Sequence, residues 1–182
     1  MGEYVSEHDV WKEAFGGRKI RRSLGQVFED GLWPALGIGP ADPMEGQRFL
    51  ALAVVLLTLP QDDYNKLRKE FEEADLSFYI PHPATYGEIR PEEQFVYFSP
   101  LLERVAFSRV LAVVAHELAH IVLGHHRKLA VTPEEEKKRE EEAWALVRKW
   151  GFEREARIHL AQRKRRETME QREKWVGCSF KF

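Results

Sequence analysis

The sequence contains little cysteine, no apolar run of membrane length and almost no net charge. Its single cysteine, Cys178, cannot pair within the chain, which excludes a disulfide scaffold and favours a reducing compartment. The longest apolar run, residues 49–59, is about half the roughly 20 residues that a membrane-spanning helix needs. A net charge of −2 excludes a general electrostatic attraction to nucleic acid.

A secretory signal is also missing, because Glu3 and Glu7 precede any apolar run. Together with the lone cysteine, this predicts a cytoplasmic protein. The 182 residues suffice for one domain with a proper core, and 43% hydrophobic with 32% charged residues is typical of a globular protein with a charged exterior.

The chain does contain an apolar segment at residues 113–124, VVAHELAHIVLG, in which His116, Glu117 and His120 follow the order HExxH. Residues i and i+4 of a helix share a face, so His116 and His120 can present ring nitrogens to one metal ion. Glu117 can take a proton from a water held there. The spacing therefore indicates a zinc hydrolase.

The surroundings of this motif strengthen the interpretation. Its flanking and interior residues are uncharged, so we expect the helix to be buried on all sides. The alternative is a pair of core histidines satisfied by hydrogen bonds, with the glutamate in an ion pair. Burying three polar side chains without a metal is costly, which favours a metal site.

Hydrophobic periodicity and helix-breaking residues predict the remaining elements. We expect helices at residues 10–15, 19–30, 44–59, 62–73, 108–123, 133–151 and 153–175, and strands at 76–80 and 94–98. Residues 33–43, rich in proline and glycine, are expected to form an irregular connector, and residues 176–182 a strand or a loose tail.

A catalytic zinc site holds three protein ligands and keeps a fourth position for water. Glu140, twenty residues after His120, is the first candidate for the third ligand, because it extends an apolar helical stripe. That stripe consists of Ala143, Leu146, Val147 and Trp150. Glu141 and Glu142 remain alternatives, because an error of one or two residues in register would exchange them for Glu140, and Glu136 is a further alternative.

His126 is a further alternative for the third ligand. It lies six residues after His120, the spacing of the third histidine in the pattern HExxHxxGxxH. That pattern places glycine where this chain has Leu123, and the glycine comes one position later as Gly124. His125 and His126 are otherwise expected to be ordinary loop residues.

The segment YFSPLLERVAFSRVLAVVAHELAHIVLGHH, followed by EEEAWALVRKWGF, resembles the core of small gluzincin-type metallopeptidases. It is similar to ImmA/IrrE-like zincin domains and to the soluble part of HtpX-like peptidases, over residues 93–152. The resemblance implies Zn²⁺ held by His116, His120 and Glu140, with Glu117 as general base. It also implies that residues 94–98 form the edge along which an extended peptide pairs.

The same resemblance implies an α+β, zincin-like fold, mostly helical, with a small mixed sheet next to the HExxH helix. We expect one domain over residues 1–182, with a helical extension (1–43), a metallopeptidase core (44–152) and a charged helix and tail (153–182). One departure concerns Trp144, which stands where related proteins have Asp or Asn to orient a zinc-bound histidine.

The predicted function is that of a gluzincin-type zinc metalloendopeptidase acting on a protein or peptide. The alternatives are a zincin-fold regulatory or binding protein that holds zinc with little peptidase activity, and a metal-free structural protein. Nucleic-acid contact through the basic residues 163–166 is disfavoured by the acids around them. The candidates for stabilising an oxyanion are His82, Tyr86, Tyr97 and His159, and the sequence does not select among them.

Overall fold

The computed structural model describes the greater part of the chain. The described residues are 14–30, 32, 47–74, 76–79, 87–90, 95–128 and 130–178. The predicted connector at 33–43 and the oxyanion candidates His82 and Tyr86 lie outside these residues, as does most of the helix predicted at 10–15.

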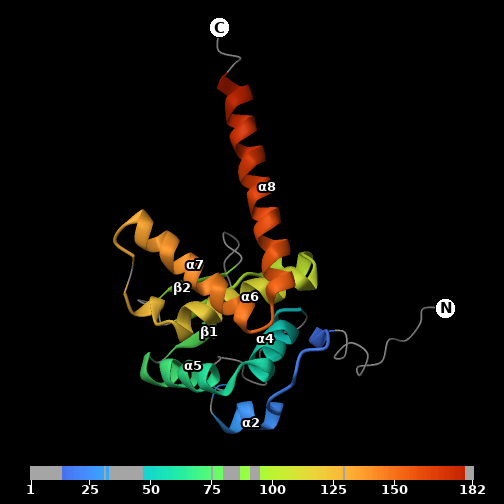
Figure 1. Ribbon diagram of the computed structural model, residues 1–182, viewed down its shortest axis with the longest axis vertical. Coiled ribbons are helices and arrows are strands. Elements are labelled where there is room, and N and C mark those ends of the chain that lie inside the picture. The colour runs from blue at the N-terminus through green and yellow to red at the C-terminus, as the bar shows by residue number, and fades with distance from the viewer. Residues whose placement is uncertain are drawn as a thin grey trace, which may run out of the picture.

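Helix α6, Phe107–Val122, lies at the centre of the fold (Figure 1). It packs against α4 (Gln47–Thr58), α5 (Gln61–Ala74), α7 (Pro133–Lys149) and α8 (Glu153–Cys178). All of its residues from Val110 to Val122 are buried except His120, which is partly exposed. The apolar run around HExxH thus forms the central core helix, as its composition predicts.

Helix α4 is the second core helix, and its residues Ala51 to Thr58 are buried. The turn before the short helix α2 (Leu24–Glu29) supports its C-terminal end. There Arg22 donates from Nη2 to the carbonyl of Leu59 at 2.8 Å, and its guanidinium lies 3.9 Å from the centroid of the Tyr64 ring on α5. Helix α5 is amphipathic, because Tyr64, Leu67 and Phe71 face the core while its other side is charged.

The three described strands form one small sheet in the order β1-β3-β2. Strand β1 (Ser77–Tyr79) runs parallel to β3 (Phe95–Phe98), and β2 (Gly87–Arg90) runs antiparallel to it. Strand β2 also contacts α6. Its sequence, GEIR, has too little apolar alternation to be recognised as a strand, and the sequence predicts no strand there.

The α+β class predicted from the sequence is wrong, because the described chain is mainly helical. Strands of three or four residues provide no sheet face broad enough to form a layer of the core. Most of the buried apolar residues instead lie on α4, α5, α6 and α7. The helices thus determine the architecture, and the sheet is a small addition beside α6.

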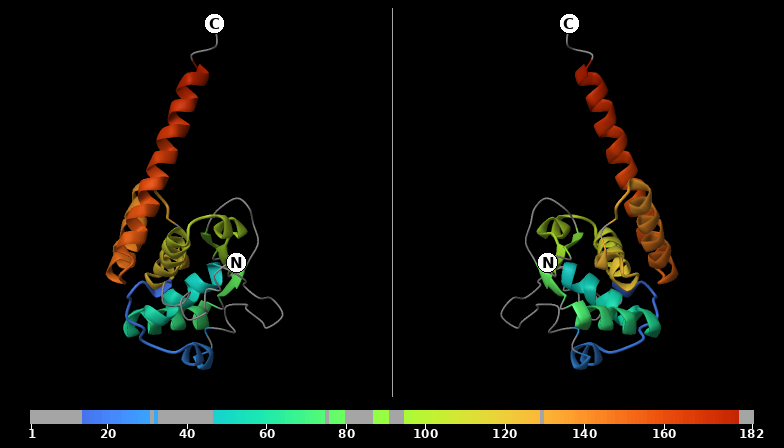
Figure 2. Two further views of the ribbon diagram at one scale, coloured as in Figure 1. Left: turned by 90° about the vertical axis from the view of Figure 1, so that its right-hand side faces the viewer. Right: turned by 90° about the vertical axis from the view of Figure 1, so that its left-hand side faces the viewer.

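Helix α8 extends well beyond the rest of the molecule (Figures 1 and 2). Its base is packed: Ala156 is buried, and Glu155 forms an ion pair with Arg18 at 2.7 Å. Residues 161–165, one turn further on, are exposed. The helix continues to Cys178, so residues 176–178 are helical rather than a strand or loose tail. Among the described residues, no helix is long and apolar enough to cross a membrane.

Candidate metal centre

Side chains from α6 and α7 converge at one point. His120 Nε2 lies 3.1 Å from Glu140 Oε1 and 3.1 Å from His116 Nε2. His116 Nε2 lies 3.4 Å from the same carboxylate oxygen. Two imidazole nitrogens and one carboxylate oxygen therefore lie within 4.8 Å of one another, a donor set that zinc binds.

The local sequence explains this convergence. The two histidines are one helical turn apart on α6, so their rings project from the same face. Glu140 comes from the middle of α7, where Ala143 is fully buried and allows the two helices to approach closely. Helix α7 begins at a defined point, because the Thr132 hydroxyl accepts a hydrogen bond from the Glu135 amide at 3.1 Å.

The electrostatics of the cluster keep Glu140 ionised. Burial alone would raise the pKa of its carboxyl group, but hydrogen bonds from His116 and His120, and the charges on these rings, lower that pKa well below its usual value. The cluster therefore offers a carboxylate together with two imidazoles. Glu117 lies beside them on α6 and is buried, with 9% of its surface exposed.

Three of the other candidates for a third ligand, Glu141, Glu142 and His126, contact groups outside the cluster, and Glu136 lines the pocket beside Glu140 without being part of the cluster. Glu141 Oε1 lies 4.0 Å from Lys137 Nζ on the exposed side of α7. Glu142 Oε2 lies 3.3 Å from His125 Nε2. His126 is buried against α5, where its Nε2 lies 3.2 Å from Glu70 Oε2. Among the described residues, the only group found with metal-binding geometry is His116, His120 and Glu140.

Comparison with known proteins bears on the chemistry of this site. Residues 80–134 match the model of Peptidase family M48. This is a family of zincin-like metallopeptidases, and the match supports the resemblance to gluzincin metallopeptidases noted from the sequence. The match does not confirm the more specific likeness to ImmA/IrrE-like or HtpX-like proteins.

The M48 match includes α6 with His116, Glu117 and His120, and it ends at Glu134, before Glu140. No curated protein and no solved structure matches the chain. The M48 likeness thus supports a metallopeptidase with a bound metal, and the placement of Glu140 rests on the contact between α6 and α7.

Trp144 lies directly against the cluster. Its indole stacks on the His116 ring, with centroids 4.1 Å apart and planes inclined by 16°. The centroid of the His159 ring on α8 lies 5.3 Å from that of Trp144. The sequence marked Trp144 only as a departure from the pattern of related peptidases. The structure shows that it restricts the plane of the His116 ring.

Among the described oxyanion candidates, His159 lies close to this cluster, because its ring neighbours Trp144. Burial, followed by the positive charges of Arg109 and neighbouring groups, lowers the pKa of His159 to about 4. Its imidazole is therefore neutral at pH 7. Tyr97, the remaining described candidate, lies on β3.

We predict that this histidine makes the metal-free protein sensitive to acid. Between pH 6.5 and about 4 the unfolded chain binds a proton at His159 that the folded chain does not, so stability falls as pH decreases through this interval. The shift corresponds to at most about 3 kcal/mol of unfolding free energy. Urea unfolding of chelator-treated protein at several pH values measures the loss. In the variant His159→Asn this loss should be smaller, and an unchanged pH profile in that variant would refute the assignment.

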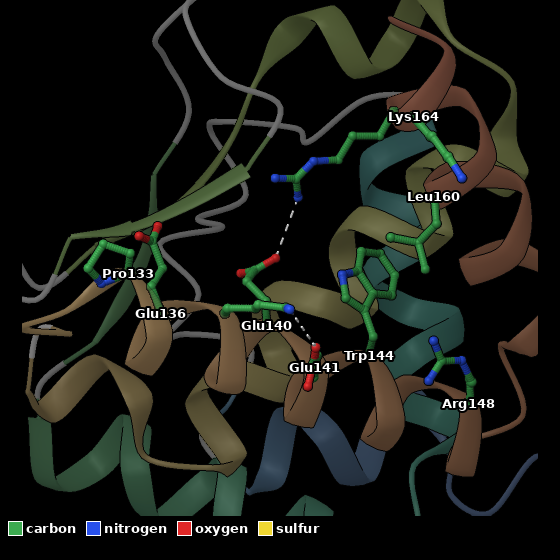
Figure 3. A pocket seen from close by; sticks show the side chains of 10 residues that line it. Pro133, Glu136, Glu140, Glu141, Trp144, Arg148, Leu160 and Lys164 are labelled. Carbon is green, nitrogen blue, oxygen red and sulfur yellow. Dashed lines mark ion pairs between the residues drawn. The ribbon is translucent and has the colours of Figure 1, made fainter. Parts of the chain in front are cut away.

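A pocket of about 840 Å³ lies between α7 and the base of α8, beside Glu140 (Figure 3). Trp144 and Leu160 form its apolar wall. Arg163, on α8, also lines the pocket, and its Nη1 lies 3.6 Å from Glu140 Oε2, the oxygen that does not face the histidines. The base of α8 is therefore part of the surroundings of the site.

Proposed function

We propose that this protein is a zinc-dependent metallopeptidase of the gluzincin type. The observation that carries the proposal is the cluster of His116 Nε2, His120 Nε2 and Glu140 Oε1 on two packed helices. The match of residues 80–134 to Peptidase family M48 supports the same chemistry. In this proposal the two histidines and Glu140 hold Zn²⁺, and Glu117 is the general base.

The donor set fits the metal. Neutral imidazole nitrogens and a carboxylate oxygen are common zinc ligands, and three protein ligands leave a fourth position open, as catalytic sites require. When bound, zinc activates a water molecule and polarises the carbonyl of the bond to be cleaved. The ionised Glu140 supplies the one negative charge of the donor set.

The remaining chemistry is assigned to Glu117. Its carboxylate accepts a proton from the attacking water and then donates it to the leaving amine. It lies one residue after a metal ligand on a buried helix, so it shares the rigid support of the ligands. His159 is neutral and nearby, and it is the described side chain that we favour for contact with the developing oxyanion.

The sheet order changes the assignment of the strand along which an extended substrate would pair. The resemblance implies residues 94–98 as this edge, but β3 lies between β1 and β2 and its backbone groups are used on both sides. Strand β2 pairs with β3 on one side, and within the described residues no strand pairs with its other side. Because β2 also contacts α6, we propose that a peptide adds along β2.

A second candidate function is that of a zinc-holding regulatory protein with little peptidase activity. The observation in its favour is Trp144, which provides a stacked ring in place of the carboxylate or amide that usually orients a ligand histidine. This alternative shares the metal site with the first proposal and differs in its chemistry.

Metal analysis combined with peptide profiling tests the proposal. We expect purified protein to bind about one Zn²⁺ per chain, as three-ligand sites do, and to cleave members of a mixed peptide pool. Chelation should abolish cleavage, lower the melting temperature and be reversed by added zinc. Zinc without cleavage of any pool would favour the regulatory function. Absence of zinc, with an unchanged melting temperature in chelator, would refute both.

A further inference from the structure

A chain of polar contacts runs outward from one of the three clustered side chains. His120 Nδ1, on the opposite side of the ring from the metal-facing nitrogen, lies 2.9 Å from His125 Nδ1. His125 Nε2 lies 3.3 Å from Glu142 Oε2 on α7. The other oxygen of Glu142 lies 3.8 Å from Lys138 Nζ. The series joins His120, His125, Glu142 and Lys138.

We propose that His125 and Glu142 are positioning residues that hold His120 in the tautomer and orientation needed to bind a divalent metal. This inference rests on the proposed function, because it concerns the same metal site. It assigns a role to two residues that the sequence had suggested only as a loop histidine and an alternative ligand.

The direction of the hydrogen bonds follows from their chemistry. An ionised carboxylate can only accept hydrogen bonds. The contact with Glu142 therefore requires His125 to carry its proton on Nε2 and to donate it to the carboxylate. The Nδ1 of a neutral His125 then carries a lone pair and accepts, which requires the proton of His120 on Nδ1. Once a metal takes the place of the proton that His120 Nε2 donates to Glu140, this nitrogen offers its lone pair on the side of Glu140 and His116. One carboxylate thus selects the metal-binding tautomer of His120 through an intervening imidazole.

The turn that carries His125 is held firmly in place. Gly124 ends α6 in the left-handed conformation, with φ 71°, and this turns the chain back so that His125 faces His120. The Arg139 guanidinium on α7 donates to the His125 carbonyl at 3.2 Å. Two residues further along the chain, Arg127 ties the same turn to α5: its Nε donates to Glu70 Oε2 at 2.6 Å and its Nη2 donates to Glu73 Oε2 at 2.7 Å.

The two histidines of the motif are supported differently. His116 Nδ1 is buried and has no hydrogen-bond partner among the described residues, and the ring is held instead by stacking on Trp144. The polar chain therefore acts on His120 alone. A hydrogen bond to the outer nitrogen of a ligand imidazole fixes its orientation and raises its basicity, which strengthens metal binding.

We call the hydrogen-bonded series His120–His125–Glu142 the relay. It is tested in the full-length protein by measuring the Zn²⁺ dissociation constant in competition with a chelator. His125→Phe keeps a ring at this position and removes Nδ1, the nitrogen that accepts the hydrogen bond from His120. We expect it to weaken zinc binding by about 10- to 100-fold. Glu142→Gln, on a half-exposed side chain, should weaken it by about tenfold. Glu141→Gln is the matched control, because its side chain is exposed and does not contact the relay.

Two further variants separate the relay from a general structural role. His125→Asn places a carboxamide oxygen close to the position of Nδ1, so it should recover most of the zinc affinity lost in His125→Phe. In the His125→Phe background, Glu142→Gln should cause no additional loss, because its effect passes through His125. The melting temperatures of the metal-free variants, and KM for a cleaved peptide at saturating zinc, should match those of the parent.

Unchanged zinc affinity in His125→Phe would overturn the relay, and so would equal effects of Glu142→Gln with and without His125. Either result leaves the proposed metallopeptidase intact, provided the parent chain binds zinc. A parent chain that binds no zinc would overturn the relay together with the proposed function.

Discussion

Glu117→Gln is expected to lower kcat on a cleaved peptide by about 10²- to 10⁴-fold, the usual contribution of a general base. The carboxamide has nearly the same shape as the carboxylate but cannot accept the proton from the attacking water. Because Glu117 is not one of the three clustered side chains that we propose as ligands, the variant should retain any zinc that the parent binds. The measurement pairs steady-state kinetics with metal analysis of the same preparation.

The comparison variant is Glu117→Asp, which keeps a carboxylate and withdraws it by one methylene, so it should retain more activity than the glutamine variant. Full activity in Glu117→Gln would show that another group accepts the proton. Loss of zinc in that variant would place Glu117 among the metal ligands and refute its assignment as base.

Glu140→Ala is expected to have the largest effect on metal binding. The substitution removes the anionic member of the donor set and leaves His116 and His120 alone at the site. We expect zinc affinity to fall by more than the roughly 100-fold that results from loss of an outer hydrogen-bond partner. Chelator competition measures the constant, and peptide cleavage at a fixed zinc concentration should disappear in parallel.

The neighbours of Glu140 provide the controls. Glu136→Ala and Glu141→Ala change carboxylates on the same helix that lie outside the metal-binding group, so both should bind zinc as the parent does. Tight zinc binding in Glu140→Ala, or a loss confined to one of the neighbours, would show that α7 presents a different residue to the site.

The HExxH helix and its side chains could be predicted from sequence because their geometry is local. The spacing of His116 and His120 within one helix is sufficient to place both rings on one face, and the apolar composition of the segment predicts burial. The geometric placement of Glu140 required one further step, the apolar stripe on α7. That step relies on the regular period of a helix face that packs against a neighbour. The roles of these residues in metal binding and catalysis remain predictions.

The features that were missed depend on contacts between distant segments. Strand β2 has a sequence without clear alternation, and its conformation comes from pairing with β3. The approach of His125 to His120 depends on the left-handed turn at Gly124 and on the guanidinium of Arg139. The predicted α+β class was wrong because strand propensity indicates where a strand forms and not how much of the core it contributes.

The central position of α6 determines how the protein responds to substitutions in its core. The same sixteen-residue helix supplies much of the buried core and two of the three clustered side chains. Any local opening that separates α6 from α4 or α7 therefore also disperses the donor atoms. If metal binds there, occupancy and core integrity are thermodynamically linked. Core substitutions on α6 would then first appear as altered metal retention, before the chain unfolds.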